Sequence, residues 1–342
     1  RITGSELAKR SPVAAGEVAA LAKLDVARTG ATLSTSRASA LDLVEIAAPP
    51  PVMAAAIEVG DRKDEVKLTA ALAKLCEEDP GLTVVQDADG GETRLGCQGE
   101  MHLRVVIERL ANRYGIRVTR RPPRVAYRET IKGAVTIHGR HKKQSGGHGQ
   151  FADVTLEIAP LPRGSGFRFD DRITGGVVPR QYIPAVEAGA RDALAAGSLG
   201  FPVIDVAVAL VDGATHPVDS SEQAFRTAGQ TAVREGLEKA GSVLLEPVLA
   251  VSIACPSEAT PKANAIVTAR RGQITGFEPR NGWPNWDIVG ALVPEAEMGE
   301  LIVELRSATA GAGTFTARLD HLAELSGRLA SDVVERRRRD AA

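Results

Sequence analysis

The residues best suited to bind a partner form a short basic, glycine-rich segment at positions 141–150, His-Lys-Lys-Gln-Ser-Gly-Gly-His-Gly-Gln. Its glycines allow positive φ angles and a close backbone approach to a ligand, while Lys142 and Lys143 supply positive charge. This combination suits the sugar-phosphate backbone of a polyanion. The segment lies between two predicted strands, so a tight hairpin turn with solvated lysines is the alternative interpretation.

Other residues with reactive side chains have simpler explanations. His138 and His141 are close enough in sequence for a metal site, but on a strand they point to opposite faces. His102, near the start of a predicted helix, is interpreted as a packed or interface residue. Ser220 is expected to cap a helix together with Gln223, which explains it without nucleophilic chemistry. We therefore expect neither a catalytic residue nor a metal site in this chain.

A phosphate-binding loop of the GTPase type is missing from the sequence. Such a loop needs a Gly-Lys-Ser or Gly-Lys-Thr step, and no lysine in this chain follows a glycine. We therefore expect no bound cofactor in this chain and no GTP hydrolysis by that machinery.

The composition indicates a globular protein of 342 residues, with 44% hydrophobic and 25% charged residues. This length allows roughly two to four domains. The formal net charge of −1 lacks the basic excess of many nucleic-acid binders, so an anionic partner must be bound by local patches. Three distant cysteines without a CxxC pair suit a reducing cytoplasm. No apolar run approaches a membrane span and no signal peptide is evident, so no membrane partner is expected.

Residues 50–125 have the element order of a small α+β domain. The apolar residues of its first helix recur every three or four positions, and its second helix ends at a glycine. The expected elements are strand 52–59, helix 62–78, strands 82–86 and 92–98 around Asp89-Gly90-Gly91, a helix that ends at Gly115, and strand 116–119. The order βαββαβ predicts a ferredoxin-like sheet with both helices on one face.

Residues 248–319 repeat this order. The expected elements are strand 248–255, helix 259–271, strands 273–279 and 286–293 around Asn281-Gly282, a helix with the stripe Met298, Leu301, Ile302 and Leu305, and strand 314–319. The predicted fold class is therefore α+β and multidomain, with two ferredoxin-like domains flanking a different α/β domain.

That middle domain, residues 126–247, is predicted to carry the basic segment at its tip. Its expected elements are strands 134–141 and 150–159, helix 182–196, strand 203–211, an exposed loop at 212–217, and a helix that ends at Gly241. We expect the loops 141–150 and 212–217 to lie at one end of this domain.

The two ends of the chain are expected to be extensions of these domains. Residues 1–47, before a proline-rich linker, are predicted to be the C-terminal part of a β-barrel domain with strands at 18–24 and 29–33. Because the chain begins at Arg1 without an initiator methionine, we interpret it as a piece of a longer protein. A helix at about 326–338 is assigned to the middle domain. The run Arg336 to Arg339 is interpreted as solvated charge, with RNA contact as the alternative.

Several motifs resemble one family, the translational GTPase elongation factor G. Residues 78–80, 99–103 and 125–131 resemble its third domain; residues 141–150, 175–180, 182–186 and 218–222 resemble its fourth; and residues 244–247, 270–274 and 305–309 with Gly313-Thr314 resemble its fifth. The motifs follow the family's order over nearly the whole chain. Two departures are His148, where many members have arginine, and the segment 258–262, which is unlike the family's usual first helix of domain V.

The resemblance implies a ribosome-binding protein that promotes movement of transfer and messenger RNA, with domain IV, of the ribosomal-protein-S5-domain-2-like type, entering the decoding site. It also implies a cytoplasmic monomer whose full-length form binds GTP and Mg²⁺ in an upstream domain. The residues that it implies in RNA contact are Lys142, Lys143, Gln144, Ser145, Gly146, Gly147, His148, Gly149, Gln150 and His216 in domain IV, and Arg270, Arg271 and Gln273 in domain V.

Two alternatives remain open on the sequence. One is a ribosome recycling or protection factor of the same architecture, and the other is a free-standing RNA-binding module. In each reading the tip binds RNA by its backbone and makes no covalent bond.

Overall fold

The computed structural model describes residues 2–3, 6–7, 12–21, 24, 26–34, 36, 47–87, 91–143 and 149–341. The chain divides into two compact units. The first consists of residues 1–87 and 92–121, and the second of residues 88–91 and 122–342.

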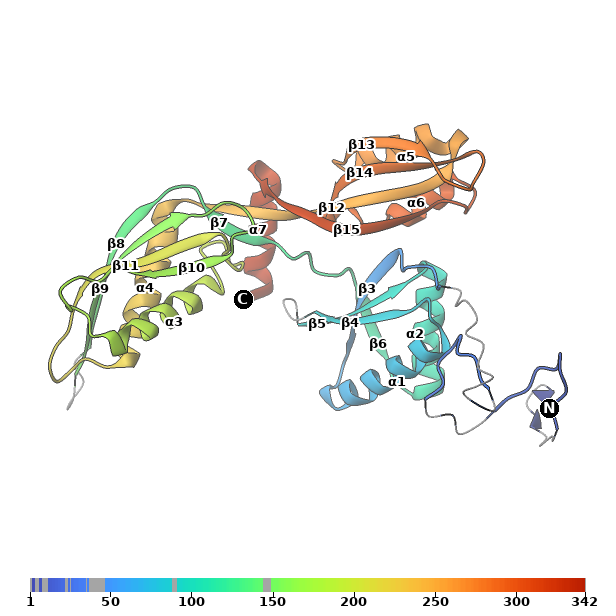
Figure 1. Ribbon diagram of the computed structural model, residues 1–342, viewed down its shortest axis with the longest axis horizontal. Helices are drawn as coiled ribbons and strands as arrows, with labels where there is room; N and C mark the ends of the chain where they lie inside the picture. Colours follow the sequence, from blue (N-terminus) through green and yellow to red (C-terminus); the bar gives the residue numbers. More distant parts are fainter. Residues whose placement is uncertain are drawn as a thin grey trace. The chain divides into compact units, whose positions relative to one another are not determined.

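The first unit contains a ferredoxin-like domain, as predicted. Its elements are β3 (Met53–Val59), the 3-10 turn Arg62–Asp64, α1 (Glu65–Glu78), β4 (Thr83–Asp87), β5 (Glu92–Cys97), α2 (Glu100–Tyr114) and β6 (Val118–Arg121) (Figure 1). The strands form an antiparallel sheet in the order β4-β5-β3-β6. The apolar stripes of both helices pack on it, with Leu75 and Leu110 fully buried. Gly115 ends α2 with a φ of 69°. Of the predicted turn 89–91, residues 89 and 90 lie outside the described residues.

The N-terminal stretch differs from the prediction. Its described part contains the two short paired strands β1 (Ile2–Thr3) and β2 (Glu6–Leu7). Described residues within the expected barrel strands 18–24 and 29–33 form turns or irregular backbone, and Val18 is fully exposed. A strand needs a neighbouring strand for its backbone hydrogen bonds, and none pairs with the described residues of these two segments.

The middle domain is a four-stranded sheet covered on one face by two helices (Figure 1). Its elements are β8 (Val135–Lys143), β9 (Gln150–Pro160), β10 (Phe167–Asp171), the 3-10 turn Arg180–Tyr182, α3 (Ile183–Leu194), β11 (Val206–Ala214) and α4 (Glu222–Ala240). The sheet order is β10-β11-β9-β8, and only the β10–β11 pair in it is parallel. Inward residues of β9, such as Val154 and Leu156, form its core with Phe225 of α4.

Two details of this domain correct the sequence prediction. Strand β10 was not predicted, because its charged residues alternate with only two phenylalanines, Phe167 and Phe169. Helix α4 is capped by Ser221, whose Oγ accepts from the N–H of Ala224, and not by Ser220. The hydroxyl of Ser220 instead accepts from the N–H of His216, which sequence spacing could not reveal.

Glycines let α4 approach its neighbours closely. A Cβ on Gly189 of α3 would lie 2.1 Å from the carbonyl oxygen of Arg226, and one on Gly229 of α4 would lie 2.9 Å from the carbonyl oxygen of Val186. On its other side, α4 touches β8 at Gly139, where a Cβ would lie 2.5 Å from the Cβ of Ala232. At these three positions α4 therefore lies closer to α3 and β8 than a larger side chain would allow.

The last domain repeats the ferredoxin-like topology. Its elements are β12 (Ser242–Pro256), the 3-10 turn Ser257–Ala259, α5 (Thr260–Ala269), β13 (Gln273–Pro279), β14 (Trp286–Pro294), the 3-10 turn Glu295–Glu297, α6 (Leu301–Ala308) and β15 (Thr314–Leu325). The sheet order β13-β14-β12-β15 matches that of the first domain. Here too the α+β fold class predicted from the sequence is confirmed.

Strand β12 also joins the middle and last domains. Its first four residues pair with β7 (Arg128–Ile131), which was not predicted as a separate strand. Glu129 of β7 is fully buried, and its carboxylate accepts from the backbone N–H groups of Leu199 and Phe201 at 3.1 and 2.7 Å. Burial raises the pKa of Glu129, while the backbone hydrogen bonds partly oppose that shift.

After β15, the chain ends in α7 (Gly327–Ala341), which confirms the predicted C-terminal helix. Its Val333 and Val334 pack on Phe201 and Leu244. No helix within the described ranges is long and apolar enough to cross a membrane.

We predict that Gly189→Ala destabilises the middle domain. The added methyl group meets the backbone of α4, so the helices must separate, at a cost of about 1–3 kcal/mol in the free energy of unfolding. Native-state hydrogen exchange of the α3 and α4 amides measures this domain separately from the others. Gly299→Ala is the matched control, because nothing lies within 4 Å of its added Cβ. Equal exchange rates in the two variants would contradict the close packing.

Candidate nucleic-acid interface

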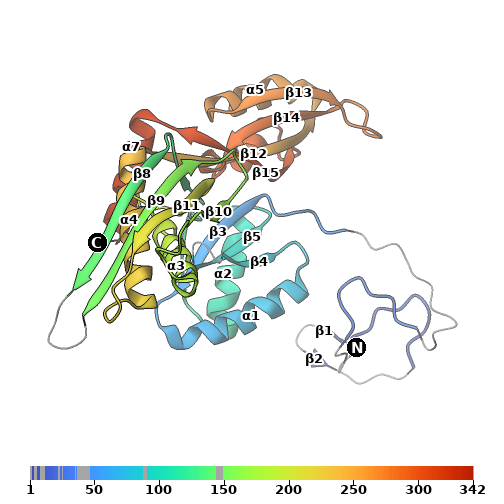
Figure 2. The same cartoon turned by 60° about the vertical axis from the view of Figure 1, so that its left-hand side comes forward.

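The two loops predicted to share one end of the middle domain are in contact. The N–H of Gly149 donates to Asp219 Oδ1 at 3.0 Å, and the N–H of Phe151 donates to the Asp219 carbonyl at 2.8 Å. Ser220 Oγ donates to the Phe151 carbonyl at 2.9 Å. The prediction that the loops lie together is therefore confirmed, and Figure 2 shows the loop before α4 beside the end of the β8–β9 ribbon.

Asp219 is the centre of this contact. Its side chain is 28% exposed and lies against Gly149, where an added Cβ would be 3.0 Å from Asp219 Cγ. A side chain at position 149 would therefore push the loops apart. Close packing between the two loops therefore explains why position 149 is a glycine, whether or not a ligand also approaches it.

His216 presents one ring nitrogen for binding. Its Nδ1 accepts from the backbone N–H groups of Val218 and Asp219 at 3.4 and 3.2 Å, which assigns the proton of the neutral ring to Nε2. The side chain is 49% exposed. Nδ1 also lies 3.3 Å from Asp219 Oδ2, a contact that becomes an ion pair only when the ring is protonated. The exposed ring therefore carries a hydrogen-bond donor.

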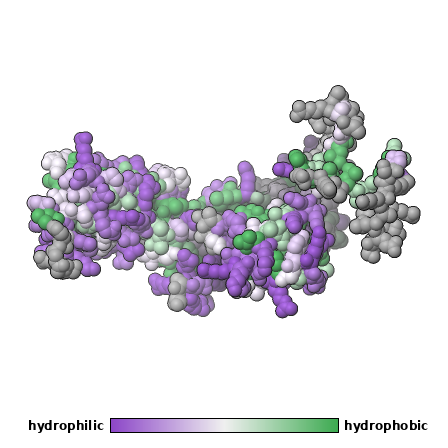
Figure 3. Space-filling model, turned by 90° about the horizontal axis from the view of Figure 1, so that it is seen from below, coloured by the Kyte–Doolittle hydropathy of each residue, from purple (hydrophilic) through white to green (hydrophobic). Residues whose placement is uncertain are grey.

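Positive charge and a half-buried aromatic ring lie beside the loops. Lys142 pairs across the ladder with Phe151, and Lys143 pairs with Gln150; both lysines and Gln150 are exposed. The Phe151 ring is 6.1 Å from the His216 ring, and the Arg140 guanidinium lies 5.4 Å from the Phe151 centroid. The face of this domain that is seen in Figure 3, on the left, is mostly hydrophilic. This end of the ribbon thus offers cations and hydrogen-bond donors to an anionic, hydroxyl-rich partner.

Five of the predicted tip residues, positions 144–148 from Gln144 to His148, lie outside the described residues. The structure describes Lys142, Lys143, Gly149 and Gln150, and it brings them together with His216. RNA contact by all ten residues stays a prediction.

The three predicted residues of the last domain differ in exposure. Arg270 is 8% exposed, and its Nη1 donates to Glu304 Oε2 at 2.8 Å, so this side chain holds α5 to α6 and offers little surface to RNA. Arg271 donates to Glu246 and to Glu297, and these hydrogen bonds raise its pKa further above the usual value. These ion pairs join residues 25 or more positions apart, so sequence spacing gave no signal for them. Arg271 and Gln273 are exposed, and RNA contact by them stays a prediction.

The other histidines considered from the sequence have neighbours in the fold. His102 Nε2 lies 3.0 Å from Asp79 Oδ2, and its Nδ1 accepts from the N–H of Gln98, as expected of a packed residue. His138 Nε2 lies 2.6 Å from Asp153 Oδ1. Within the part of the chain that the structure describes, no group of three or more His, Cys, Asp or Glu residues is arranged to hold a metal ion.

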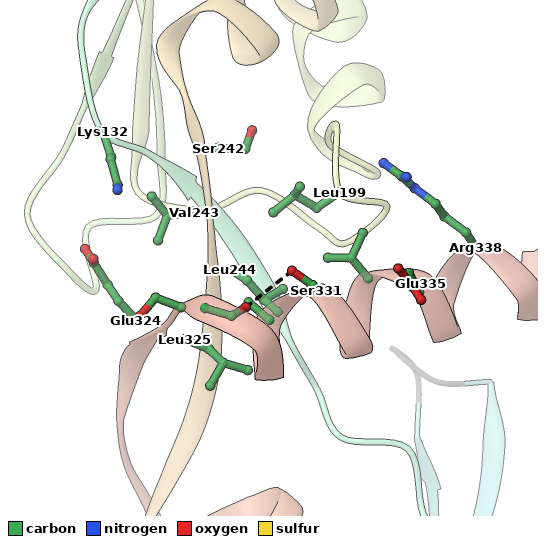
Figure 4. A pocket seen from close by; sticks show the side chains of 14 residues that line it. Lys132, Leu199, Ser242, Val243, Leu244, Glu324, Leu325, Ser331, Glu335 and Arg338 are labelled. Atoms are coloured by element: carbon green, nitrogen blue, oxygen red, sulfur yellow. Dashed lines mark hydrogen bonds between the residues drawn. The ribbon is translucent and has the colours of Figure 1, made fainter.

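A groove of about 560 Å³ follows the contact of α7 with the start of β12 (Figure 4). Leu199 and Leu244 line it together with Lys132, Glu335 and Arg338. Its charges are of both signs and it is open to solvent. The groove therefore follows from the packing of α7 on β12 and lacks the features of a specific ligand site. Part of the predicted charge run is packed, since Arg337 donates to the Gly200 carbonyl at 3.0 Å.

Comparison with known proteins gives the class of this architecture. Residues 48–122 match the family Elongation Factor G, domain III; residues 123–241 match Elongation factor G, domain IV; and residues 243–333 match Elongation factor G C-terminus. The three matches follow one another along the chain and give it the domain order of the elongation factor G family of translation factors.

Relatives along the whole chain support the same family. An elongation factor G-like protein from Synechocystis sp. is 48% identical over 333 residues, which are 97% of this chain and 50% of that protein. A crystal structure of a Thermus thermophilus protein has a TM-score of 0.74 at 39% identity, covering 85% of this chain and 43% of that one. The chain belongs to the elongation factor G family. It spans about half the length of the curated relative it matches.

We predict that Asp219→Ala loosens the contact between the two loops. The variant removes the acceptor of the Gly149 N–H and leaves the backbone bond of Phe151 in place. Loss of one such bond costs about 1 kcal/mol locally, so the Gly149 amide should exchange several-fold faster by NMR. Asp212→Ala is the control, because that carboxylate accepts from the N–H of Gly213 in its own loop. Unchanged exchange at Gly149 would show that Asp219 does not hold the loops.

Proposed function

We propose that this chain is the ribosome-binding portion of an elongation factor G-like protein that promotes movement of transfer and messenger RNA. On this proposal the end of the middle domain that carries Lys142, Gln150 and His216 enters the decoding site. The observation that supports it best is the bonding of the two loops through Asp219, which holds the described end of the ribbon beside His216.

The residue types at this end fit RNA backbone better than base sequence. Lys142 and Lys143 provide charge for phosphates, and Gln150 and His216 Nε2 provide donors for phosphate or 2′-hydroxyl oxygens. None of these contacts distinguishes one base from another. Such a surface suits a factor that must accept every transfer RNA.

A rigid arm can promote movement without chemistry of its own. When it occupies a site that RNA has just left, it favours the moved state by as much as it binds that state more tightly. The β8–β9 ribbon provides this arm, because its ladder continues without a register shift from Val135 to Lys143. We assign no covalent step to this chain.

GTP binding and hydrolysis, with Mg²⁺, are proposed for the part of the full-length protein that this chain does not include. The chain accounts for half the length of its Synechocystis relative, and no lysine in it follows a glycine as a phosphate-binding loop requires. We propose a cytoplasmic monomer whose partners are ribosomal, transfer and messenger RNA on the ribosome.

Replacing Lys142 and Lys143 with alanine in the full-length protein tests the role of the tip. Both side chains are exposed, so folding should be unchanged. We expect weaker ribosome binding at every salt concentration, with the slope of log K against log[salt] reduced by about 1–2, and slower translocation. Co-sedimentation with ribosomes in a GTP analogue, followed by a translocation assay, measures both.

The matched control for this test is Lys74→Ala with Lys262→Ala, which removes two exposed lysines from other domains. It should leave binding and translocation unchanged. Wild-type translocation by the tip variant would contradict the assignment. Normal ribosome binding without translocation by the wild-type protein would favour the recycling alternative.

A further inference from the structure

The last domain has an exposed aromatic cluster that its fold does not use. It lies in the turn between β13 and β14, at the end of this ribbon (Figure 2). Trp283 is 50% exposed and meets the half-buried Trp286 edge to face, with ring centroids 5.3 Å apart. The Arg280 guanidinium lies 4.0 Å from the Trp283 centroid and 5.4 Å from that of Trp286. Leaving an indole in water forfeits burial of a large apolar surface, which a partner can recover.

Backbone hydrogen bonds hold this turn in place. The N–H of Arg280 donates to the Trp286 carbonyl at 2.7 Å, and the N–H of Trp283 donates to the Arg280 carbonyl at 3.1 Å. The Asn285 carbonyl accepts from the N–H of Ser257 at 2.9 Å, which anchors the turn to the start of the first helix of the domain. The rings are thus positioned before any partner arrives, which lowers the entropic cost of binding.

A hollow of about 720 Å³ borders the cluster and is lined by residues 279–287 and Ser257. The hollow is open to solvent, so it offers a surface for a stacked base and does not enclose a ligand. The hollow also contains Asp287, but both of its carboxylate oxygens accept hydrogen bonds, from Ser257 Oγ at 2.9 Å and Thr260 Oγ1 at 2.7 Å. Arg280 is the cation of the hollow, and it lies beside the aromatic surface.

We infer that Trp283 and Arg280 form a stacking site for an unpaired base of single-stranded RNA, with Arg280 also available to the adjoining phosphate. Indole rings and guanidinium planes are the surfaces on which splayed bases stack, and stacking tolerates any base. Only the source of the RNA depends on the proposed function, which makes it ribosomal. The stacking site is separate from the tip, since it uses neither lysines nor the β8–β9 ribbon.

A proline-rich peptide is the competing occupant, because such peptides bind aromatic grooves. The geometry favours the base. The two indoles stand at 66° to each other, so they form no parallel slot for a proline ring, and the Arg280 guanidinium over Trp283 offers a planar surface on which a base can stack. A cation at that place suits a nucleotide, which brings its own negative charge.

The chain offers a direct readout, because Trp283 and Trp286 are its only two tryptophans. Tryptophan fluorescence, excited selectively over that of the three tyrosines, therefore reports on this turn alone. We expect quenching when the chain is titrated with a single-stranded oligoadenylate roughly ten nucleotides long, whose bases are unpaired. An abasic oligonucleotide of the same length, which keeps the phosphates, should cause no quenching. Quenching by the abasic strand, or none by oligoadenylate, would overturn the inference.

Affinity for the labelled oligoadenylate, measured by fluorescence anisotropy, tests the residue assignment. Trp283→Ala should weaken binding roughly 5- to 100-fold, and Trp283→Phe should restore part of it. Leu319→Ala is the control, because it removes another exposed apolar side chain, 63% exposed, from the same domain. Circular dichroism checks that each variant folds. Equal affinity of Trp283→Ala and the control would refute a stacking role, as would quenching by a proline-rich peptide but not by RNA.

The tip variant distinguishes a failure of the stacking site from a failure of the proposed function. Lys142→Ala with Lys143→Ala should retain fluorescence quenching by oligoadenylate, since both tryptophans remain. If RNA quenches the fluorescence but ribosome binding fails, the stacking site is supported and the proposed function fails. If ribosome binding depends on the lysines and no quenching occurs, the stacking site fails and the proposed function stands.

Discussion

The second unit depends on the pairing of one strand, β12, with three partners. Its residues 242–245 pair with β7, residues 248–256 pair with β14, and β15 runs along most of its length. A slip of one residue would exchange buried Ile253 with exposed Ser252, which opposes a change of register at this point of the strand. Glu129 adds a second constraint, because its buried carboxylate bonds β7 to the loop that α7 packs against. The tip-bearing domain is thereby tied by backbone bonds to the sheet of the last domain.

The helices and strands with a periodic pattern of apolar residues could be predicted from the sequence. Both ferredoxin-like domains followed from strand and helix order, and the stripe that includes Leu68, Leu72 and Leu75 identified the buried face of α1. The meeting of the two tip loops was also predictable, because each connects elements that return to the same end of the sheet. The candidate site therefore came from local composition together with topology.

The parts that sequence reasoning missed depend on side-chain contacts that residue type and spacing do not determine. Arg270 is of a residue type that often binds RNA, but its guanidinium forms an ion pair with Glu304 of α6. Position alone could not show whether Ser220 or Ser221 caps α4, since both hydroxyls accept a nearby N–H. The described residues of the expected barrel strands are not in strands, and a strand forms only where a partner strand supplies its backbone hydrogen bonds. The exposed tryptophans form a candidate site through the contact of Trp283 with Arg280, which residue type alone does not reveal.

The glycine contacts of α4 have a mechanical consequence. At Gly139 the ribbon lies directly on the helix, and at Gly189 and Gly229 the two helices touch through their backbones. Such an interior has little free volume and resists compression. A force applied to the far end of the ribbon is therefore borne by the sheet, α3 and α4 together. It reaches the last domain through the pairing of β7 with β12. A protein built in this way transmits force over the length of a domain with little loss to internal deformation.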